Sequence, residues 1–352
     1  MRIGILAPPW IPIPPPAYGG IEEVVDTLAC GLSELGHRVV LAAHPASTCP
    51  VERMPTVGPA PSGRIGDTQQ ELRFVADSYA AFEGHRVDIV HDHTVVGPAY
   101  LRRPVGLAVV TTVHGPFTAE VQRQFRSVPS DVGVVAISRH QARTAGPVRI
   151  DRTIHHGIDA EHIAPGDGGG GYLAFLGRMA PDKGVREAIE VARCAGLPLL
   201  IAAKMRETQE REYFADIIEP LLGGAVEYLG ELGTQEKFEL LRSAIAMVNP
   251  LRWPEPFGMV MIEAMAVGTP VIATPEGAAS ELIDDGVSGF LRRSVADLAA
   301  TIPLAGDMDR VRVRAHVLRH FTKEQMALNY ADYFSAVLGD SYRVLDGTAA
   351  GL

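Results

Sequence analysis

Short apolar runs alternate with segments of helical spacing along most of the chain. Residues 3–7 form an apolar run typical of a buried strand, and residues 21–35 carry apolar side chains at helical intervals, ending at Gly36. Further β-branched runs predict strands at residues 39–43, 87–90, 109–113 and 132–137. Strands that alternate with helices in this way are typical of a parallel sheet covered by helices.

The alternation stops at residues 158–171, a polar run that ends in consecutive glycines and predicts a linker without rigid structure. It then restarts. Strands are predicted at residues 172–176, 199–203, 226–229, 245–248 and 271–273, and helices at residues 185–195, 209–222, 234–244 and 258–267. We therefore expect two α/β halves, with a cleft between them where the carboxyl ends of the strands meet.

The pattern divides the chain into four parts. We expect an N-terminal domain at 1–157, the linker at 158–171, a C-terminal domain at 172–321 and an amphipathic packing helix at 322–338. The total of 352 residues agrees with two domains of ~150 residues each. Residues 46–70 show little periodicity and predict a surface loop.

Composition narrows the class of partner. Lysine and arginine number 32 against 42 acidic residues, a net charge of -10, which argues against nucleic acid or an anionic membrane as the main partner. The three cysteines form no CxxC pair, so the sequence suggests neither a disulfide framework nor a zinc site. No run of ~18 apolar residues is present. We expect a cytoplasmic protein without an integral membrane segment.

Two glutamates flank a predicted helix start. Glu255 precedes Pro-Phe-Gly, and Glu263 lies eight positions later inside the apolar stretch 259–267. If the helix opens at Gly258, the backbone N–H groups of residues 257–260 form a set of donors suited to phosphate or sugar oxygens. The alternative is that Glu255 only complements the helix dipole and that Glu263 pairs with a distant arginine.

A second candidate cluster follows the first strand of the second half. Arg178 and Lys183 lie on either side of a turn, and Pro181 is placed to start a helix. Two cations in front of that helix can neutralise a diphosphate without Mg²⁺. The alternative is that both side chains are simply solvated.

The first half carries weaker signals. Gly19 and Gly20 allow backbone amides to approach a ligand, although a plain turn explains them equally well. They do not form G-x-G-x-x-G, which disfavours a nicotinamide-dependent dehydrogenase. His114 ends a predicted strand, where α/β proteins place ligand contacts. His91 and His93 have metal-ligand spacing, but no third ligand is signalled.

Taken together, these motifs resemble family 4 of the retaining glycosyltransferases. The resemblance rests on Gly19-Gly20, residues 112–115, Leu176-Gly177-Arg178, Lys183-Gly184 and, most specifically, Glu255-Pro256-Phe257-Gly258 with Glu263-Ala264. It implies a GT-B fold with two Rossmann-like domains. The second domain would hold a nucleotide-sugar donor, the first would bind the acceptor, and the last helix would return to the first domain.

The resemblance also implies a role for each candidate residue. Arg178 and Lys183 would hold the donor diphosphate, Glu263 the ribose hydroxyls, and Glu255 the transferred sugar. The amides at Phe257, Gly258, Met259 and Val260 would contact sugar or phosphate, His114 would lie near the sugar, and Gly19-Gly20 would close on the diphosphate. Lys204 stands where many members have a glycine-rich turn, so it either touches the nucleotide or only caps a strand.

The implied reaction moves a sugar from a UDP- or GDP-linked donor to a hydroxyl of a sugar, a lipid or a small natural product. Members of the family are thought to retain the anomeric configuration by same-face attack, because no covalent nucleophile is evident, and no cofactor or obligatory metal is implied. Two alternatives stay open. One is a nucleotide-sugar epimerase or hydrolase of the same fold, and the other is a non-catalytic protein that binds nucleotide sugars.

Overall fold

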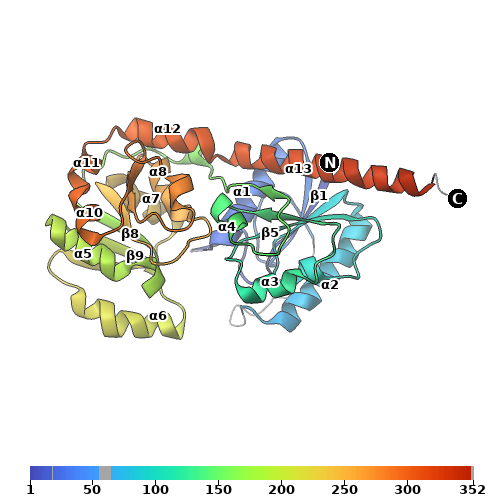
Figure 1. Ribbon diagram of the computed structural model, residues 1–352, viewed down its shortest axis with the longest axis horizontal. Helices are drawn as coiled ribbons and strands as arrows, with labels where there is room; N and C mark the ends of the chain where they lie inside the picture. The colour runs from blue at the N-terminus through green and yellow to red at the C-terminus, as the bar shows by residue number, and fades with distance from the viewer. Residues whose placement is uncertain (18, 55–64, 350–352) are drawn as a thin grey trace. The chain divides into compact units, whose positions relative to one another are not determined.

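The computed structural model describes residues 1–17, 19–54 and 65–349. It divides into two compact units (Figure 1). Unit 1 is Met1–Gly157 together with helix α13 (Lys323–Ala349), and unit 2 is Ile158–Thr322. Each unit holds its own parallel sheet with helices packed on it, so the predicted fold class of two Rossmann-like domains is confirmed.

The sheet of unit 1 has, in the part that the structure describes, seven parallel strands in the order β3-β2-β1-β4-β5-β6-β7. The strands are β1 (Arg2–Leu6), β2 (Arg38–Ala42), β3 (Glu52–Arg53), β4 (Ile89–Asp92), β5 (Ala108–Val113), β6 (Val132–Ala136) and β7 (Arg152–Thr153). Because the chain leaves β1 toward β2 on one side and continues beyond β4 on the other, ligands of such a sheet bind at the carboxyl ends of β1 and β4.

The helices of unit 1 include the last helix of the chain. They are α1 (Gly20–Glu34), α2 (Thr68–His85), α3 (Ala119–Phe125), α4 (Arg139–Arg143) and α13, with a short 3-10 turn η2 (Gly97–Ala99). Helix α13, red in Figure 1, packs against α1. Gly31 permits the close approach, because a Cβ at this position would lie 2.9 Å from Cβ of Ala327.

Helix α2 was not predicted from the sequence pattern. Its buried residues Val75, Tyr79 and Phe82 recur at helical spacing, and Asp67 caps its first turn by accepting hydrogen bonds from the N–H groups of Gln69 and Gln70. The loop predicted at residues 46–70 instead contains strand β3 and the first three residues of this helix. Residues 55–64 of that loop lie outside the described residues.

The sheet of unit 2 has six parallel strands among the described residues, in the order β10-β9-β8-β11-β12-β13. The strands are β8 (Leu173–Arg178), β9 (Leu199–Lys204), β10 (Val226–Gly230), β11 (Ala246–Asn249), β12 (Val271–Ala273) and β13 (Gly289–Leu291). The strands predicted from the apolar runs are confirmed to within a residue or two at either end.

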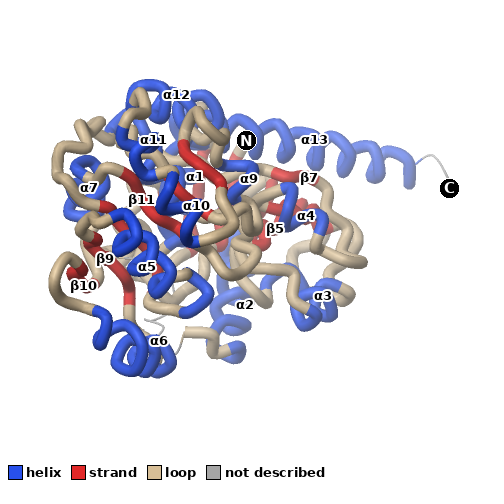
Figure 2. The backbone as a smooth tube through the Cα atoms, turned by 60° about the vertical axis from the view of Figure 1, so that its left-hand side comes forward, coloured by secondary structure: helices blue, strands red, loops and turns tan. Residues whose placement is uncertain are grey.

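Helices pack around this sheet (Figure 2). The helices are α5 (Val185–Ala195), α6 (Thr208–Tyr213), α7 (Thr234–Ser243), α8 (Met259–Ala266), α9 (Ala279–Leu282), α10 (Val295–Ala300), α11 (Ile302–Gly306) and α12 (Arg310–His320), with short turns η3 (Ala160–His162), η4 (Pro181–Lys183), η5 (Phe214–Ile218) and η6 (Glu219–Leu221). Helix α5 contacts α10, whereas α8 contacts α7 and α12.

Two segments of unit 2 differ from the sequence prediction. The single helix predicted at residues 209–222 is instead α6, the π-helical η5 and the 3-10 turn η6. Pro220 lies in η6, where its missing N–H cannot continue an α-helix. The glycine-rich run is also more fixed than predicted, because the N–H groups of Gly166, Gly168 and Gly170 donate to the carbonyls of Val267, Arg242 and Ser243.

Among the described residues, no helix combines the length and the apolar character needed to cross a membrane.

Candidate functional site

The candidate site of unit 2 lies where the order of its strands reverses. Strands β8 and β11 are neighbours, and the chain proceeds from β8 toward β9 on one side and from β11 toward β12 on the other. Open α/β sheets bind ligands at the carboxyl ends of such a strand pair. Arg178 is the last residue of β8, and Asn249, which ends β11, leads into the segment that carries Glu255.

Backbone contacts join the loops that leave these two strands. The N–H of Arg252 donates to the carbonyl of Asp182 at 2.9 Å. Gly184 has φ +75°, and a Cβ there would lie 2.0 Å from the carbonyl oxygen of Pro250, so only glycine fits this approach. The turn that carries Lys183 is therefore held against the segment that carries Glu255.

Lys183, Glu255 and Trp253 form one cluster. The Nζ of Lys183 donates to Oε2 of Glu255, and the Nε1–H of Trp253 donates to the same oxygen at 2.9 Å. Lys183 Nζ also lies 4.5 Å from the centre of the Trp253 ring. The lysine and glutamate side chains are only 13% and 15% exposed. A mostly buried cation with three N–H groups is thus held in place by a carboxylate and an aromatic face.

Helix α8 begins just after this cluster. Gly258 precedes it with φ +102°, and a Cβ there would lie 2.2 Å from Cε of Met261. The first N–H groups of a helix have no acceptor within the helix, so those at Met259 and Val260 are oriented toward its entrance. The side chain of Phe257 is buried and contacts the ring of Phe321 edge-to-face, which fixes the entering chain.

Glu263 is buried inside helix α8 but does not lack a partner. It is 3% exposed and accepts a hydrogen bond at 2.9 Å from Nζ of Lys237, which projects from helix α7. The partner is a lysine rather than the distant arginine of the alternative reading. The ion pair explains how a carboxylate is tolerated in an apolar helix.

Arg178 belongs to a neighbouring group of charges. It pairs in register with Lys204 at the ends of β8 and β9, and it contacts Glu210 at 3.4 Å and Asp182 at 3.5 Å. Burial raises the pKa of Glu210, but hydrogen bonds from the N–H groups of Glu207 and Arg206 and the nearby charges of Lys204 and Arg178 lower it overall. Lys204 thus lies at a strand end beside Arg178.

Gly19 and Gly20 lie at the start of helix α1 in unit 1, on the connection that leaves β1. A Cβ at Gly19 would lie 2.7 Å from Cβ of Pro15 and 2.9 Å from Oε2 of Glu22, whereas one at Gly20 would meet nothing within 4 Å. Gly19 is therefore required by packing, and Gly20 has open space around it.

His114 belongs to a column of four histidines in unit 1. Ring centres are 4.0 Å apart for His91 and His93, 5.1 Å for His93 and His114, and 5.2 Å for His114 and His156. Nδ1 of His93 and Nε2 of His114 lie 2.8 Å apart, within hydrogen-bond distance. Burial lowers the pKa of all four, that of His114 to about 4. At neutral pH, His114 is an uncharged imidazole with a fixed neighbour.

Helix α13 contributes to the same column. The hydroxyl of Tyr330 lies 2.8 Å from Oγ1 of Thr112, which in turn lies 2.7 Å from Nε2 of His91. The metal interpretation considered for His91 and His93 gains no support from the described residues, because Nε2 of His91 is engaged by Thr112 and neither histidine belongs to a group of ligands close enough to share an ion.

Comparison with known proteins identifies the family of the chain. The chain matches the family described as Glycosyl transferases group 1 over residues 163–307 and the family described as Glycosyltransferase Family 4 over residues 18–162. The chain belongs to the family 4 glycosyltransferases.

Proteins similar to this glycosyltransferase include a mannosyltransferase, a glycogen synthase and a crystallised glycosyltransferase. A phosphatidyl-myo-inositol mannosyltransferase of Mycolicibacterium smegmatis is 28% identical over 83% of this chain and 80% of that protein. A glycogen synthase of Mycobacterium tuberculosis is 27% identical over 82% and 83%. A crystallised glycosyltransferase involved in avilamycin A biosynthesis is 26% identical, covers 97% of this chain and 98% of its own, and has a TM-score of 0.75.

Sequence reasoning missed four residues that contact the predicted site residues. Trp253 and Glu210 contact the predicted cations, and Lys237 contacts Glu263. Gly277, with φ +60°, lets its loop approach the backbone of Glu255, where a Cβ would lie 2.2 Å from the Glu255 nitrogen. The Trp-Pro-Glu-Pro run was the available signal for Trp253. The other three contacts depend on chain segments that meet only in the fold.

The structure brings Lys183 together with Glu255, and Arg178 together with Lys204. It places Glu263 and Gly258 on or beside the same short helix. The ligand contacts inferred for these residues, for His114 and for the Gly19-Gly20 pair stay predictions.

Replacing Gly184 by alanine is expected to destabilise the protein by about 2–4 kcal/mol, because the positive φ and the close Pro250 carbonyl both oppose a Cβ. Gly196 is the matched control, since it also has a positive φ, +67°, but open space around it. Gly196→Ala should cost only about 1 kcal/mol. Urea unfolding of both variants measures the difference, and equal losses would show that the Pro250 contact is unimportant.

The histidine column predicts a pH dependence of stability. The pKa values of these histidines in the folded state lie below the ordinary 6.5. Their contribution to the free energy of unfolding is therefore complete above pH 6.5 and is lost as the pH falls toward 4. Buried Asp92, whose pKa burial raises to about 7, acts in the opposite direction. The test therefore compares the slope of the unfolding free energy against pH in the wild type and in a histidine variant. His114→Asn should flatten the fall in unfolding free energy between pH 6.5 and 4 by up to ~1.4 kcal/mol per pH unit. An unchanged slope would contradict the assignment.

Proposed function

We propose that the protein is a retaining glycosyltransferase that moves a sugar from a nucleoside-diphosphate sugar to an acceptor hydroxyl, with no metal ion on the diphosphate. The observation that carries the proposal is the Lys183, Glu255 and Trp253 cluster at the entrance of helix α8. It combines a fixed cation, a carboxylate and backbone N–H groups where the loop after β8 meets the segment that leads into α8. A sugar linked to a diphosphate needs each of these three kinds of group.

Charge stabilisation is the main contribution of the chain to the reaction. The bond between the anomeric carbon and the diphosphate oxygen breaks, and its electron pair leaves with the diphosphate. The acceptor oxygen bonds to the same face of the sugar, and its proton passes to the departing phosphate oxygen. Lys183, Arg178 and the N–H groups at the start of α8 stabilise the negative charge that develops.

Glu255 has two tasks in this proposal. One oxygen holds Lys183 and Trp253 in place, and the carboxylate as a whole accepts hydrogen bonds from hydroxyls of the transferred sugar. Orientation of the sugar in this way lowers the barrier by positioning rather than by covalent attack.

Glu263 is assigned to the nucleoside. Its carboxylate accepts hydrogen bonds from both ribose hydroxyls, and Lys237 pairs with it in its buried position. Lys204 and Arg178, at adjacent strand ends, are assigned to the phosphates on the same side.

A donor panel tests the proposed function. The protein is screened by thermal shift against UDP-, GDP- and ADP-linked sugars, and release of the nucleoside diphosphate is then measured with and without an acceptor library. We expect one donor to stabilise the protein and to be consumed rapidly only when an acceptor is present. Rapid release of free sugar without acceptor would indicate a hydrolase, and a new sugar stereoisomer an epimerase. Binding without any turnover would indicate a non-catalytic protein.

A further inference from the structure

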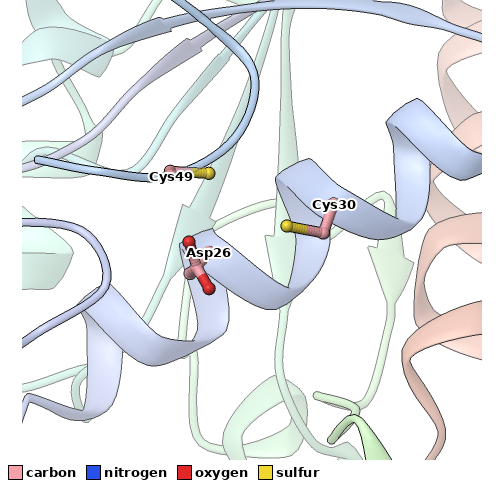
Figure 3. Close-up of side chains that lie close together, drawn as sticks. All are labelled: Asp26, Cys30 and Cys49. Carbon is pink, nitrogen blue, oxygen red and sulfur yellow. The ribbon is translucent and has the colours of Figure 1, made fainter.

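Three side chains of unit 1 converge at a point that the glycosyl transfer does not use (Figure 3). Asp26 and Cys30 are one turn apart on the same face of helix α1, and Cys49 comes from the loop that follows strand β2. One ligand atom from each lies within 4.8 Å of the other two. Among the described residues, this is the group of histidine, cysteine and acidic side chains that is close enough to share one ion.

The group is largely shielded from water. Cys49 is 1% exposed, and Cys30 is half-buried. Oδ1 of Asp26 is buried and finds no hydrogen-bond partner among the described atoms. Burial raises the pKa of Asp26, although a hydrogen bond from Cys49 opposes that effect. A buried carboxylate oxygen without a donor needs either a proton or a cation.

The two thiols lie within hydrogen-bond distance of each other. The hydrogen bond from Cys49 lowers the pKa of Cys30, whereas the same interaction, together with burial, raises the pKa of Cys49. Thiolates, rather than thiols, are the metal ligands.

We propose that Asp26, Cys30 and Cys49 bind a thiophilic divalent cation of the zinc class, with water completing a four-coordinate site. Two thiolates and one carboxylate suit Zn²⁺, whereas Mg²⁺ and Ca²⁺ prefer oxygen ligands alone. Binding converts both thiols to thiolates, so up to two protons are released to solvent when the ion enters.

The site would tie together segments that position the glycine pair. The N–H groups of Thr48 and Cys49 donate to the carbonyl of Ile13 at 2.7 and 2.9 Å, and the N–H of Ile13 donates to Oγ of Ser47 at 2.9 Å. Ile13 lies on the connection between β1 and Gly19. An ion held by α1 and by the Cys49 loop therefore braces the middle of that connection, at Ile13, and the helix that follows it. This inference is independent of the proposed function.

Cadmium is the probe, because its bond to thiolate gives an ultraviolet charge-transfer band. The full-length protein is reduced, freed of metal and titrated with Cd²⁺, and the same titration is repeated on variants. We expect one Cd²⁺ per chain, competed by Zn²⁺ and not by Mg²⁺, for the wild type. Cys194→Ser should bind equally well, because Cys194 is exposed and lies in unit 2.

Ligand variants decide the assignment. Cys30→Ser and Asp26→Asn should each weaken Cd²⁺ binding by more than the ~10–100-fold that loss of an outer-shell partner costs. Asp26→Asn keeps the shape of the side chain, and circular dichroism of both variants confirms folding, so loss of binding cannot be attributed to unfolding. Zn²⁺ should raise the Tm of the wild type and leave that of Cys30→Ser unchanged.

Several results would overturn the proposal. The first is the absence of a charge-transfer band in the reduced wild type. The second is a band that survives Cys30→Ser but disappears in Cys194→Ser. The third is a reduced protein that binds no Cd²⁺ but forms a Cys30–Cys49 disulfide with oxidised glutathione, which would identify a redox pair. Binding that is unaffected by Asp26→Asn would remove the carboxylate from the site and contradict the three-ligand assignment.

Discussion

Replacing Lys183 by alanine is expected to lower kcat/KM for the donor by about 10²–10³-fold. Lys183 is the mostly buried cation that Glu255 and Trp253 hold at the entrance of helix α8. Removal of a fixed charge that faces the departing diphosphate costs transition-state stabilisation of this order. Steady-state kinetics with the donor found in the panel measures the effect.

The control for this variant is Arg186→Ala. Arg186 lies three residues further along, is 58% exposed and pairs with Glu190 on the surface of helix α5, so its loss should change kcat/KM by less than about 2-fold. Equal effects of Lys183→Ala and Arg186→Ala would show that Lys183 does not act on the donor.

The two glutamates are expected to separate binding from catalysis. Glu263→Gln should weaken affinity for the nucleoside diphosphate by about 10–100-fold, because hydrogen bonds to a charged acceptor are replaced by weaker ones, while kcat changes little. Glu255→Gln should lower kcat by a similar factor and leave nucleoside-diphosphate affinity within about 3-fold, because its proposed contacts are to the transferred sugar. Calorimetric titration together with steady-state kinetics measures both quantities.

Lys237 supplies the control for the Glu263 prediction. If Glu263 only pairs with Lys237 inside unit 2, Lys237→Met and Glu263→Gln will both destabilise the protein without a specific loss of nucleotide affinity. The proposed role predicts instead that Glu263→Gln weakens nucleotide binding much more than Lys237→Met does. Small and equal effects of both variants on nucleotide affinity would remove Glu263 from the donor site.

The elements around the site could be predicted well from the sequence, because their patterns are local. The strand that ends at Arg178 and the helix that starts after Gly258 follow from short apolar runs with glycine at the boundary. Asp309 lies likewise at a helix start, where its side chain caps α12 by accepting from the N–H groups of Val311 and Arg312.

The partners of the charged residues could not be predicted in the same way. Lys237 is 26 residues from Glu263, and Lys183 is 72 residues from Glu255. Neither spacing has a periodic signature. The contact between Lys183 and Glu255 depends on the packing of Gly184 against Pro250, which is a property of the folded loops.

The glycine-rich run and the cysteines show the limits of composition. Gly166 was interpreted as part of a linker without rigid structure, but a Cβ there would lie 2.2 Å from the carbonyl oxygen of Arg242, so glycine serves close packing. Cys30 and Cys49 form no CxxC pair and gave no sign of a metal site. Their proximity, with Asp26 on the same helix face as Cys30, appears only when the loop after β2 is folded against α1.

The anomeric configuration of the product tests the central claim most directly. An α-linked donor and the identified acceptor are incubated with the protein, and the new glycosidic linkage is assigned by nuclear magnetic resonance coupling constants during the reaction. Same-face transfer assisted by the departing diphosphate predicts an α-linkage from the first turnover onward. A β-linked product would require attack from the opposite face and would contradict the account.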